Sequence, residues 1–360
     1  MEIPDDLVDI MKLARKYDAS DIHIVAGVPP AFRIDGEIIL ADAPPLSREE
    51  TAGMVRELLG EAQRRELERE MELCFSIPDS EYGRFRVAVY CQERNPEMAI
   101  RRCRREIPAR EELGLPPVVE EMARKKRGLV LITGPTGMGK TTTLNFMIDL
   151  INGERRCKIV TIEDPIEFVH RRKKAIVVQQ EVHTDTRSFS RALVHVLRQD
   201  PDVICVGEMR DLETISTALT AAETGHLVLA TLHTPNAAQT VERIVAVFPA
   251  EQQNQITAQL ANCIEGVIAQ LLLPRPGKSG RALATEILVA NTAVRRLIRE
   301  GDLYKVQNVI QTGRKSGMQT MDDSLRALYE RGEVSYDTAV SHARDPDAIL
   351  GKKKAGQVLD

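Results

Sequence analysis

The stretch Gly134-Pro-Thr-Gly-Met-Gly-Lys-Thr141 decides the fold, because its glycines, lysine and threonine have the spacing G-x-x-x-x-G-K-[ST]. The apolar run Leu129-Val-Leu-Ile132 before it predicts a buried strand, and apolar residues recurring at helical spacing from Leu144 to Ile151 predict a helix after it. Gly153 is expected to close that helix. A strand, a glycine-rich turn and a helix in this order predict a P-loop within an α/β fold.

A P-loop binds phosphates through its backbone N–H groups and the N-terminus of the helix that follows it. Lys140 is expected to reach the β- and γ-phosphates, and the Thr141 hydroxyl is expected to ligate Mg²⁺. A glycine-rich turn without a ligand is the alternative, and the flanking strand and helix disfavour it. The predicted ligands are therefore ATP and Mg²⁺, and the predicted contacts are Gly134, Pro135, Thr136, Gly137, Met138, Gly139, Lys140, Thr141 and Thr142.

Two further predicted strands end in acids. Lys158–Glu163 is followed by Asp164 and, after Pro165, by Glu167, whereas the strand 202–207 is followed by Glu208. Ligands of open α/β sheets bind at the carboxyl ends of the strands, so these acids are expected to face the nucleotide. Hydrolysis needs carboxylates for Mg²⁺ and for the attacking water. Solvated acids at strand ends are the alternative, and two such strands after a P-loop favour the functional interpretation.

A third apolar strand, 225–234, is expected to end at the same edge and carries two histidines. His233 is the more exposed by pattern, because Thr234 and Pro235 follow it. A polar side chain at this edge could sense the γ-phosphate. The alternative for His226 is a core histidine with satisfied hydrogen bonds.

The N-terminal part of the chain has an α+β order. The residues from Leu7 to Ala14 show helical spacing, Asp35-Gly36 is a hairpin turn signal, and Ser47 with Glu50 forms a capping box at a helix start.

Alternating apolar residues predict strands over 84–91 and 97–103 in the same region. The period of two places Arg86 and Arg101 on the polar face of these strands. The segment 101–105 contains further arginines, so the sequence does not single out one arginine of this region as the one that contacts a ligand.

Composition limits the classes of partner. The chain has 360 residues, with 49 Lys+Arg against 53 Asp+Glu, so a chain-wide basic coat for nucleic acid or an anionic membrane is excluded, although local basic patches are not. With no Trp, 6 Tyr and 7 Phe, a surface that stacks bases on aromatic rings is disfavoured. Its six cysteines form no C-x-x-C pair, which disfavours a zinc ribbon or disulfide framework and favours a reducing compartment. The acidic start and the absence of an apolar run of ~18 residues predict a cytoplasmic chain that touches membranes only through partners.

The motifs together resemble those of the secretion-type hexameric ATPases, and within them the PilT family of type IV pilus retraction motors. Four segments resemble the P-loop, Asp box, acidic strand motif and His box: 134–143 (GPTGMGKTTT), 161–170 (TIEDPIEFVH), 200–211 (DPDVICVGEMRD) and 220–234 (TAAETGHLVLATLHT). Segments 18–36, 293–300 and 311–324 are similar to the N-terminal domain and C-terminal helices of that family. The helix motif AVRRLIRE departs from the usual AIRNLIRE at Val294 and Arg296. The change to Val294 is conservative, whereas the change from Asn to Arg296 weakens the inference about coupling to the pilus.

The resemblance implies a RecA-like P-loop ATPase core with an N-terminal α+β PAS-like domain and C-terminal helices. The expected organisation is the PAS-like domain over 1–108, a proline-containing basic linker over 109–127, the RecA-like domain over 128–285, a helical subdomain over 286–344 and a flexible tail over 345–360.

The resemblance also implies roles for single residues. Glu167 is expected to be the general base, with Glu163 beside it, and Glu208 to support Mg²⁺ and water. Histidines His226 and His233 are expected near the γ-phosphate and a subunit interface. Arginines Arg86 and Arg101 match those that the N-terminal domain brings to the nucleotide.

The expected function is a Mg²⁺-dependent ATPase motor, a homo-hexamer at the inner face of the cytoplasmic membrane, which retracts pili through an inner-membrane platform protein. The missing cysteine tetrad favours retraction over the alternative, a pilus-extension or type II secretion ATPase. A nucleotide-gated auxiliary subunit that serves a paralogous motor is a further alternative. A RecA-like DNA translocase is disfavoured by charge and by the scarcity of aromatics.

Overall fold

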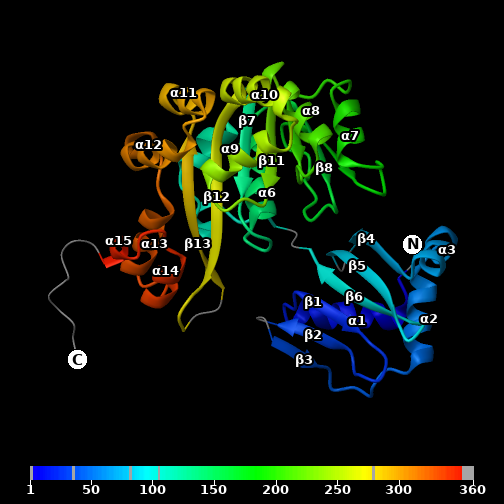
Figure 1. Cartoon of the computed structure of the whole chain (residues 1–360). Coiled ribbons are helices and arrows are strands. Elements are labelled where there is room, and N and C mark those ends of the chain that lie inside the picture. Colours follow the sequence, from blue (N-terminus) through cyan, green and yellow to red (C-terminus); the bar gives the residue numbers. More distant parts are fainter. Residues whose placement is uncertain (1–2, 35–36, 81–82, 104–105, 278–279, 351–360) are drawn as a thin grey trace, which may run out of the picture. The chain divides into compact units, whose positions relative to one another are not determined.

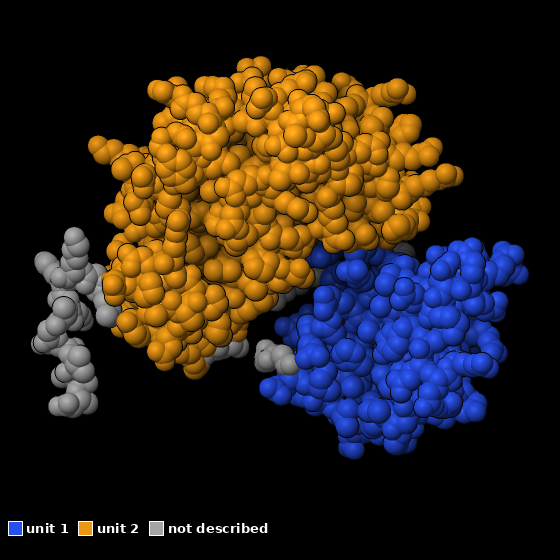
Figure 2. All heavy atoms as spheres, viewed as in Figure 1, with its two compact units in different colours: residues 1–106, 165–169 blue, residues 107–164, 170–360 orange. Residues whose placement is uncertain are grey.

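The computed structural model describes residues 3–34, 37–80, 83–103, 106–277 and 280–350 (Figure 1). The chain divides into two compact units (Figure 2). Unit 1 comprises residues 1–106 together with 165–169, and unit 2 comprises 107–164 and 170–360. The short segment 165–169, which carries Glu167, therefore belongs to unit 1 although both of its chain neighbours belong to unit 2.

Unit 1 is built on an antiparallel sheet with strand order β3-β2-β1-β6-β5-β4. Its core includes Leu7, Phe85 and Ile100, which are fully buried. The elements are α1 (Asp5–Lys16), β1 (Asp21–Ile24), β2 (Ala31–Ile34), β3 (Glu37–Leu40), α2 (Arg48–Leu58), α3 (Glu61–Glu70), β4 (Glu72–Ser80), β5 (Gly83–Gln92) and β6 (Asn95–Arg102).

Local sequence signals explain several of these elements. The predicted capping box is confirmed, because the Glu50 N–H donates to Ser47 Oγ at 3.1 Å and the Ser47 N–H donates to Glu50 Oε2 at 2.6 Å. The strands predicted over 84–91 and 97–103 are β5 and β6. The turn signal Asp35-Gly36 lies outside the described residues, while the strands on either side of it, β2 and β3, pair antiparallel.

Unit 2 is built on a sheet with strand order β13-β12-β7-β11-β10-β8-β9, in which only the edge pair β12–β13 is antiparallel. Its strands are β7 (Gly128–Thr133), β8 (Lys158–Glu163), β9 (Ile176–Glu181), β10 (Val203–Val206), β11 (Leu227–Leu232), β12 (Ile264–Pro274) and β13 (Arg281–Val289). Its helices are α4 (Arg110–Leu113), α5 (Val118–Ala123), α6 (Lys140–Glu154), α7 (Phe189–Val196), α8 (Leu212–Glu223), α9 (Ala237–Ala246), α10 (Ala250–Cys263), α11 (Thr292–Glu300), α12 (Val306–Thr312), α13 (Met321–Glu330), α14 (Tyr336–His342) and α15 (Asp347–Leu350), with 3-10 turns at Leu303–Lys305 and Arg314–Ser316.

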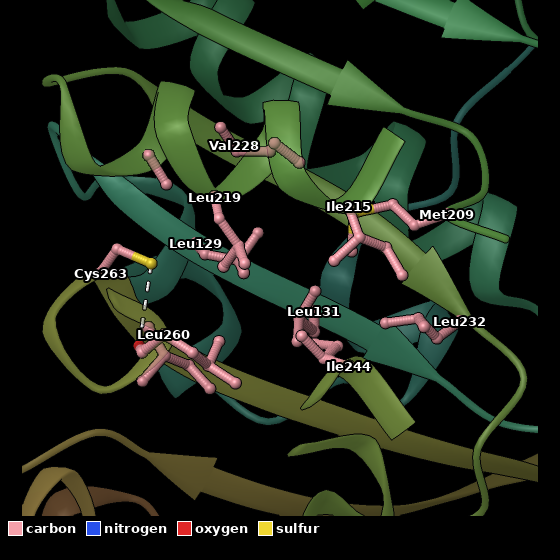
Figure 3. Close-up of a cluster of buried hydrophobic side chains, with 14 of the residues drawn as sticks. Leu129, Leu131, Met209, Ile215, Leu219, Val228, Leu232, Ile244, Leu260 and Cys263 are labelled. Atoms are coloured by element: carbon pink, nitrogen blue, oxygen red, sulfur yellow. Dashed lines mark hydrogen bonds between the residues drawn. The ribbon is translucent and has the colours of Figure 1, made fainter. Parts of the chain in front are cut away.

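The sheet of unit 2 is buried on both faces, as a parallel sheet requires. Leu129 and Leu131 of β7 face a core that Ile215, Ile244 and Leu260 complete from α8, α9 and α10 (Figure 3). The alternate residues of β7, Val130 and Ile132, face a second core that α5 and α6 supply. The continuous apolar runs in the sequence therefore reflect strands that are covered from both sides.

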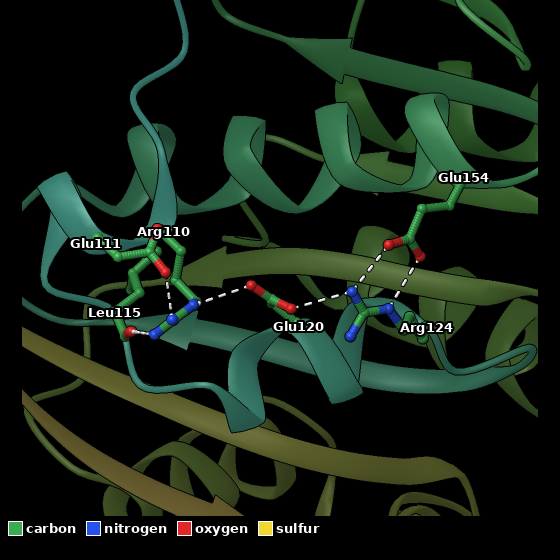
Figure 4. A network of polar contacts seen from close by, with 6 residues as sticks. All are labelled: Arg110, Glu111, Leu115, Glu120, Arg124 and Glu154. Carbon is green, nitrogen blue, oxygen red and sulfur yellow. Dashed lines mark hydrogen bonds and ion pairs between the residues drawn. The ribbon is translucent and has the colours of Figure 1, made fainter.

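Three expectations about the organisation of the chain differ from the structure, and the first concerns the linker. The expected linker 109–127 contains α4 and α5, with Val119 and Met122 buried. Arg110 Nε pairs with Glu120 Oε1 at 2.9 Å, and Arg124 pairs with Glu120 at 3.0 Å and with Glu154 of α6 at 2.8 Å (Figure 4). The residues that look like a basic linker are thus fixed onto unit 2 by acids on neighbouring helices.

The C-terminal end of the described chain is also more ordered than expected. Within the expected tail 345–360, α15 forms and buries Ile349. Where the tail begins, the N–H groups of Arg344 and Asp345 donate to the Asp322 carboxylate at 2.8 and 3.1 Å. Strand β13 also runs to Val289, past the expected boundary at 285. None of the described helices is both long and apolar enough to span a bilayer.

Candidate active site

The loop between β7 and α6 has the conformation that its glycines allow. Gly134, Gly137 and Gly139 have φ values of +139°, +79° and +78°, which residues with side chains rarely adopt. A Cβ atom on Gly134 would lie 2.4 Å from the carbonyl oxygen of Gln270 on β12. The helix that follows runs through Gly153 to Glu154 and ends in the extended residue Arg155, so Gly153 does not close it.

Lys140, the first residue of α6, is buried at the centre of the loop. Its ammonium group donates to the carbonyl oxygens of Gly134 at 2.7 Å and Pro135 at 2.9 Å. Burial lowers the pKa of this ammonium, and the nearby Glu208 carboxylate opposes that shift. A glycine loop, a buried lysine and a helix N-terminus form a cradle that fits a nucleotide's phosphates.

The other residues that are predicted to contact the nucleotide lie in the loop and in the first turn of α6. Pro135, Thr136 and Gly137 are exposed, whereas Gly139 lies close to Leu272 of β12. The Met138 sulfur accepts a hydrogen bond from the Leu272 N–H at 3.1 Å, which ties the loop to β12. Thr141 and Thr142 are half-buried in the first turn of α6.

Glu208 and His233 lie beside this loop, as predicted for the carboxyl edge of the sheet. Glu208 Oε1 lies 2.8 Å from His233 Nε2, and it accepts a hydrogen bond from Arg210 Nε at 2.5 Å. His233 Nδ1 lies 3.4 Å from both Lys140 Nζ and Thr136 Oγ1. Because the Lys140 ammonium can only donate a hydrogen bond, Nδ1 is the acceptor that faces the loop.

Arg210 is the residue of this cluster that sequence reasoning missed. Its hydrogen bond to Glu208 raises the pKa of the guanidinium. Its side chain is 76% exposed, so it remains accessible while it neutralises an acid at the edge of the loop. The sequence did contain an indication of this role, because Arg210 stands two residues after the predicted acid Glu208 within the segment 200–211.

Glu163 ends β8 and is buried. Its Oε1 accepts from Thr161 Oγ1 at 2.6 Å and from Gln179 Nε2 at 3.0 Å. The neighbouring Asp164 is exposed. Glu163 thus lies at the predicted sheet edge with its carboxylate held by neighbours.

Glu167 lies with the two predicted arginines in unit 1. Burial raises the pKa of the Glu167 carboxyl, and the charges of Arg86 and Arg101 counteract that shift. Arg86 and Arg101 are opposite each other on β5 and β6, and Arg101 Nε donates to Asp21 Oδ1 at 2.8 Å. A carboxylate and two guanidinium groups therefore gather around the segment 165–169.

His226 does not join the loop cluster. It precedes β11 and lies at the amino end of that strand, whereas His233 follows the carboxyl end. The two histidines are seven residues apart, which at ~3.3 Å per residue separates them by about 23 Å. His226 Nδ1 lies 3.0 Å from the Ala221 carbonyl oxygen, so within this chain it matches the alternative of a locally satisfied histidine. Its expected place near the γ-phosphate or a subunit interface stays a prediction.

Among the residues that the structure describes, no three His, Cys, Asp or Glu side chains lie close enough together to hold a metal ion. Thr141 and Glu208 stay the predicted protein ligands.

The β7–loop–α6 unit, with Glu208 and His233 at the same sheet edge, defines a P-loop nucleotide-binding protein. The chain belongs to the family described as type II/IV secretion system protein, whose model matches residues 2–342. This confirms the predicted family and the mixed α/β fold.

Similar proteins extend over nearly the whole chain. It is 44% identical to the type IV pilus retraction ATPase PilT of Pseudomonas aeruginosa, over 95% of this chain and 99% of that protein. It is 41% identical to the type IV pilus ATPase PilU of the same organism, over 98% of this chain and 92% of that one. A crystal structure of the pilus retraction motor PilT with bound ADP matches with a TM-score of 0.89 and 47% identity, over 95% of this chain and 98% of that chain.

Proposed function

We propose that this protein is a Mg²⁺-dependent ATPase motor that drives type IV pilus retraction. The observation that carries the proposal is the Lys140–His233–Glu208 cluster on a P-loop, in a chain that matches PilT over nearly the full length of both proteins. In the proposal the chain acts as a homo-hexamer at the cytoplasmic face of the inner membrane. It engages a membrane platform protein of the pilus machinery.

ATP with Mg²⁺ supplies the phosphoanhydride bond whose cleavage releases the free energy for mechanical work. Lys140 exchanges the carbonyl oxygens of Gly134 and Pro135 for phosphate oxygens, for which its charge is better suited. Thr141 and Glu208 provide oxygens at the cation. His233 holds Glu208 through Nε2 and presents Nδ1 to the loop.

Glu167 orients and deprotonates the attacking water in this proposal. Burial raises the pKa of its carboxyl, which makes it a better base, while Arg86 and Arg101 keep it ionised. The same arginines stabilise the charge that develops on the transferred phosphoryl group, in the manner of arginine fingers.

Purified wild-type protein is expected to hydrolyse ATP only with Mg²⁺, and Lys140→Ala is expected to remove that activity. A strain lacking the gene is expected to be hyperpiliated and to lose twitching motility. Loss of pili would instead support an extension or secretion ATPase, and Mg²⁺-independent activity shared by Lys140→Ala would refute an ATPase that uses this loop.

The two arginines can be separated by substitution. Arg86→Ala or Arg101→Ala is expected to leave ATP binding nearly intact and to reduce turnover by ~10³-fold if that residue is the finger. Arg101 already pairs with Asp21, so Asp21→Asn serves as a control for loss of that ion pair alone. An equal loss of binding and turnover would assign the arginine to the fold of unit 1.

An auxiliary motor subunit is the second candidate, because this chain matches two distinct type IV pilus ATPases of one organism at similar identity, 44% for PilT and 41% for PilU. In that case purified protein binds ATP but turns over slowly, and a paralogous motor restores motility to the deletion strain. Full turnover without any need for a paralogue would eliminate this candidate.

A further inference from the structure

A chain of buried hydrogen bonds leads from the first turn of α6 to the residues on both sides of the segment 165–169. It begins at the carbonyl oxygen of Thr141, which accepts from Asn145 Nδ2 at 2.9 Å. Asn145 Oδ1 then lies 2.7 Å from His170 Nε2. Asn145 is fully buried and His170 nearly so.

The direction of these bonds is fixed by chemistry. Because Asn145 Nδ2 donates to a carbonyl oxygen, its Oδ1 faces His170 and must accept a hydrogen bond. His170 Nε2 therefore carries the proton. Burial lowers the pKa of the imidazole to about 4, so the ring is neutral near pH 7 and has this single N–H to donate.

The second half of the chain of bonds leads back to β8. The backbone N–H of His170 donates to Gln179 Oε1 at 2.9 Å, and Gln179 Nε2 donates to Glu163 Oε1 at 3.0 Å. Gln179 lies on β9 opposite Thr161 of β8, which also donates to Glu163. One continuous network thus joins Glu163, just before Asp164 and the segment 165–169, to His170, just after it.

We infer that Asn145, His170 and Gln179 are positioning residues for ATP hydrolysis, because they fix both ends of the segment that carries Glu167 to the helix that begins at the phosphate loop. This inference rests on the proposed function, in which Glu167 is the base. The segment 165–169 has only five residues, so the network sets the points at which the chain leaves unit 2 before Glu167 and returns to it afterwards. A misplacement of about 1 Å can cost ~10²-fold in rate.

His170→Phe and His170→Gln form the central comparison. Phenylalanine keeps a ring of similar shape but leaves Asn145 Oδ1 without its donor, whereas the glutamine amide can restore an N–H near the position of Nε2. We expect His170→Phe to lower kcat by ~10- to 10²-fold, with KM for ATP and the Kd for ADP changed less than twofold. His170→Gln should recover most of the lost kcat.

Asn152→Ala is a matched control on the same helix. Asn152 is buried and bonds the chain just beyond His170, donating to the Arg171 carbonyl at 2.8 Å and accepting from the Lys173 N–H at 3.1 Å. We expect it to lower thermal stability but to leave kcat within twofold of wild type. Gln179→Met removes the other arm of the network and provides a second test if His170→Phe does not fold.

The outcomes separate the inference from the proposed function. If wild-type protein hydrolyses ATP and both His170→Phe and Gln179→Met have the same kcat as wild type, the inference is overturned but the proposed function is not. The same holds if His170→Gln fails to rescue, or if Asn152→Ala lowers kcat as much as His170→Phe does. Wild-type protein that binds ATP without hydrolysing it overturns the proposed function, and the positioning role falls with it.

Discussion

The buried imidazole of His170 makes the stability of unit 2 depend on pH in a predictable direction. Burial lowers its pKa to about 4, from 6.5 in an exposed histidine. Asp149 and Lys173 act on the ring with opposite signs and partly offset each other. The unfolded chain takes up a proton as the pH falls below 6.5, and the folded chain resists it until about pH 4, so stability is lost between these values.

The size of the effect follows from the two pKa values. At pH 5.0 the pH is about 1.5 units below the pKa of the imidazole in the unfolded chain, whereas the folded imidazole is still neutral. Protonation of the unfolded chain therefore lowers the free energy of unfolding by about 2 kcal/mol relative to pH 7.5. For a domain of this size, about 2 kcal/mol lowers the melting temperature by about 4–8 °C.

Thermal unfolding of wild type and His170→Gln, each at pH 7.5 and pH 5.0, measures this contribution. Glutamine does not titrate, and the other groups titrate alike in both proteins, so the wild type is expected to lose about 4–8 °C more than the variant. Equal losses in the two proteins would refute a neutral buried His170. A His170 ring signal that titrates near 6.5 in NMR would do the same.

Other predictions test the loop, the core and the cysteines. Gly134→Ala should weaken ADP binding by ~10-fold or more, because its Cβ would lie 2.4 Å from the Gln270 carbonyl oxygen; unchanged affinity in a calorimetric titration would contradict the strained loop. Leu131→Ala should cost about 2–5 kcal/mol of unfolding free energy, and a loss below about 1 kcal/mol in chemical denaturation would mean that the core collapses around the cavity. A maleimide at neutral pH should label the exposed Cys74 and spare Cys205, whose thiol is fully buried and has its pKa raised by that burial; peptide mapping that finds Cys205 labelled in the folded protein would show that unit 2 opens.

Local patterns sufficed to predict the loop and the elements around it. Strand β7 and helix α6 follow from a continuous apolar run and a 3.6-residue period, and the Ser47–Glu50 cap follows from two side chains three residues apart. Glu208 and His233 were placed correctly because the carboxyl ends of parallel strands share an edge.

Features that depend on register or on short elements escaped prediction. Gln179 meets Glu163 only because β9 pairs with β8 in one particular register, which no local pattern encodes. Helix α5 follows two prolines and contains only six residues, so its apolar stripe resembles part of a linker. The predicted strand 225–234 began two residues too early, because β11 starts at Leu227 and leaves His226 in front of it.

Because residues 165–169 belong to unit 1, they limit which fragments and chimaeras of this chain are useful. Arg84 Nε donates to the Ile166 carbonyl oxygen at 2.8 Å, so unit 1 includes a piece that is encoded more than fifty residues downstream of its main body. A fragment ending at residue 106 would lack that piece. Exchanging residues 1–106 between relatives would place a foreign N-terminal unit against the recipient's own five residues. Unit 1 is therefore not a transferable module, and chimaeras between related motors should exchange both segments together.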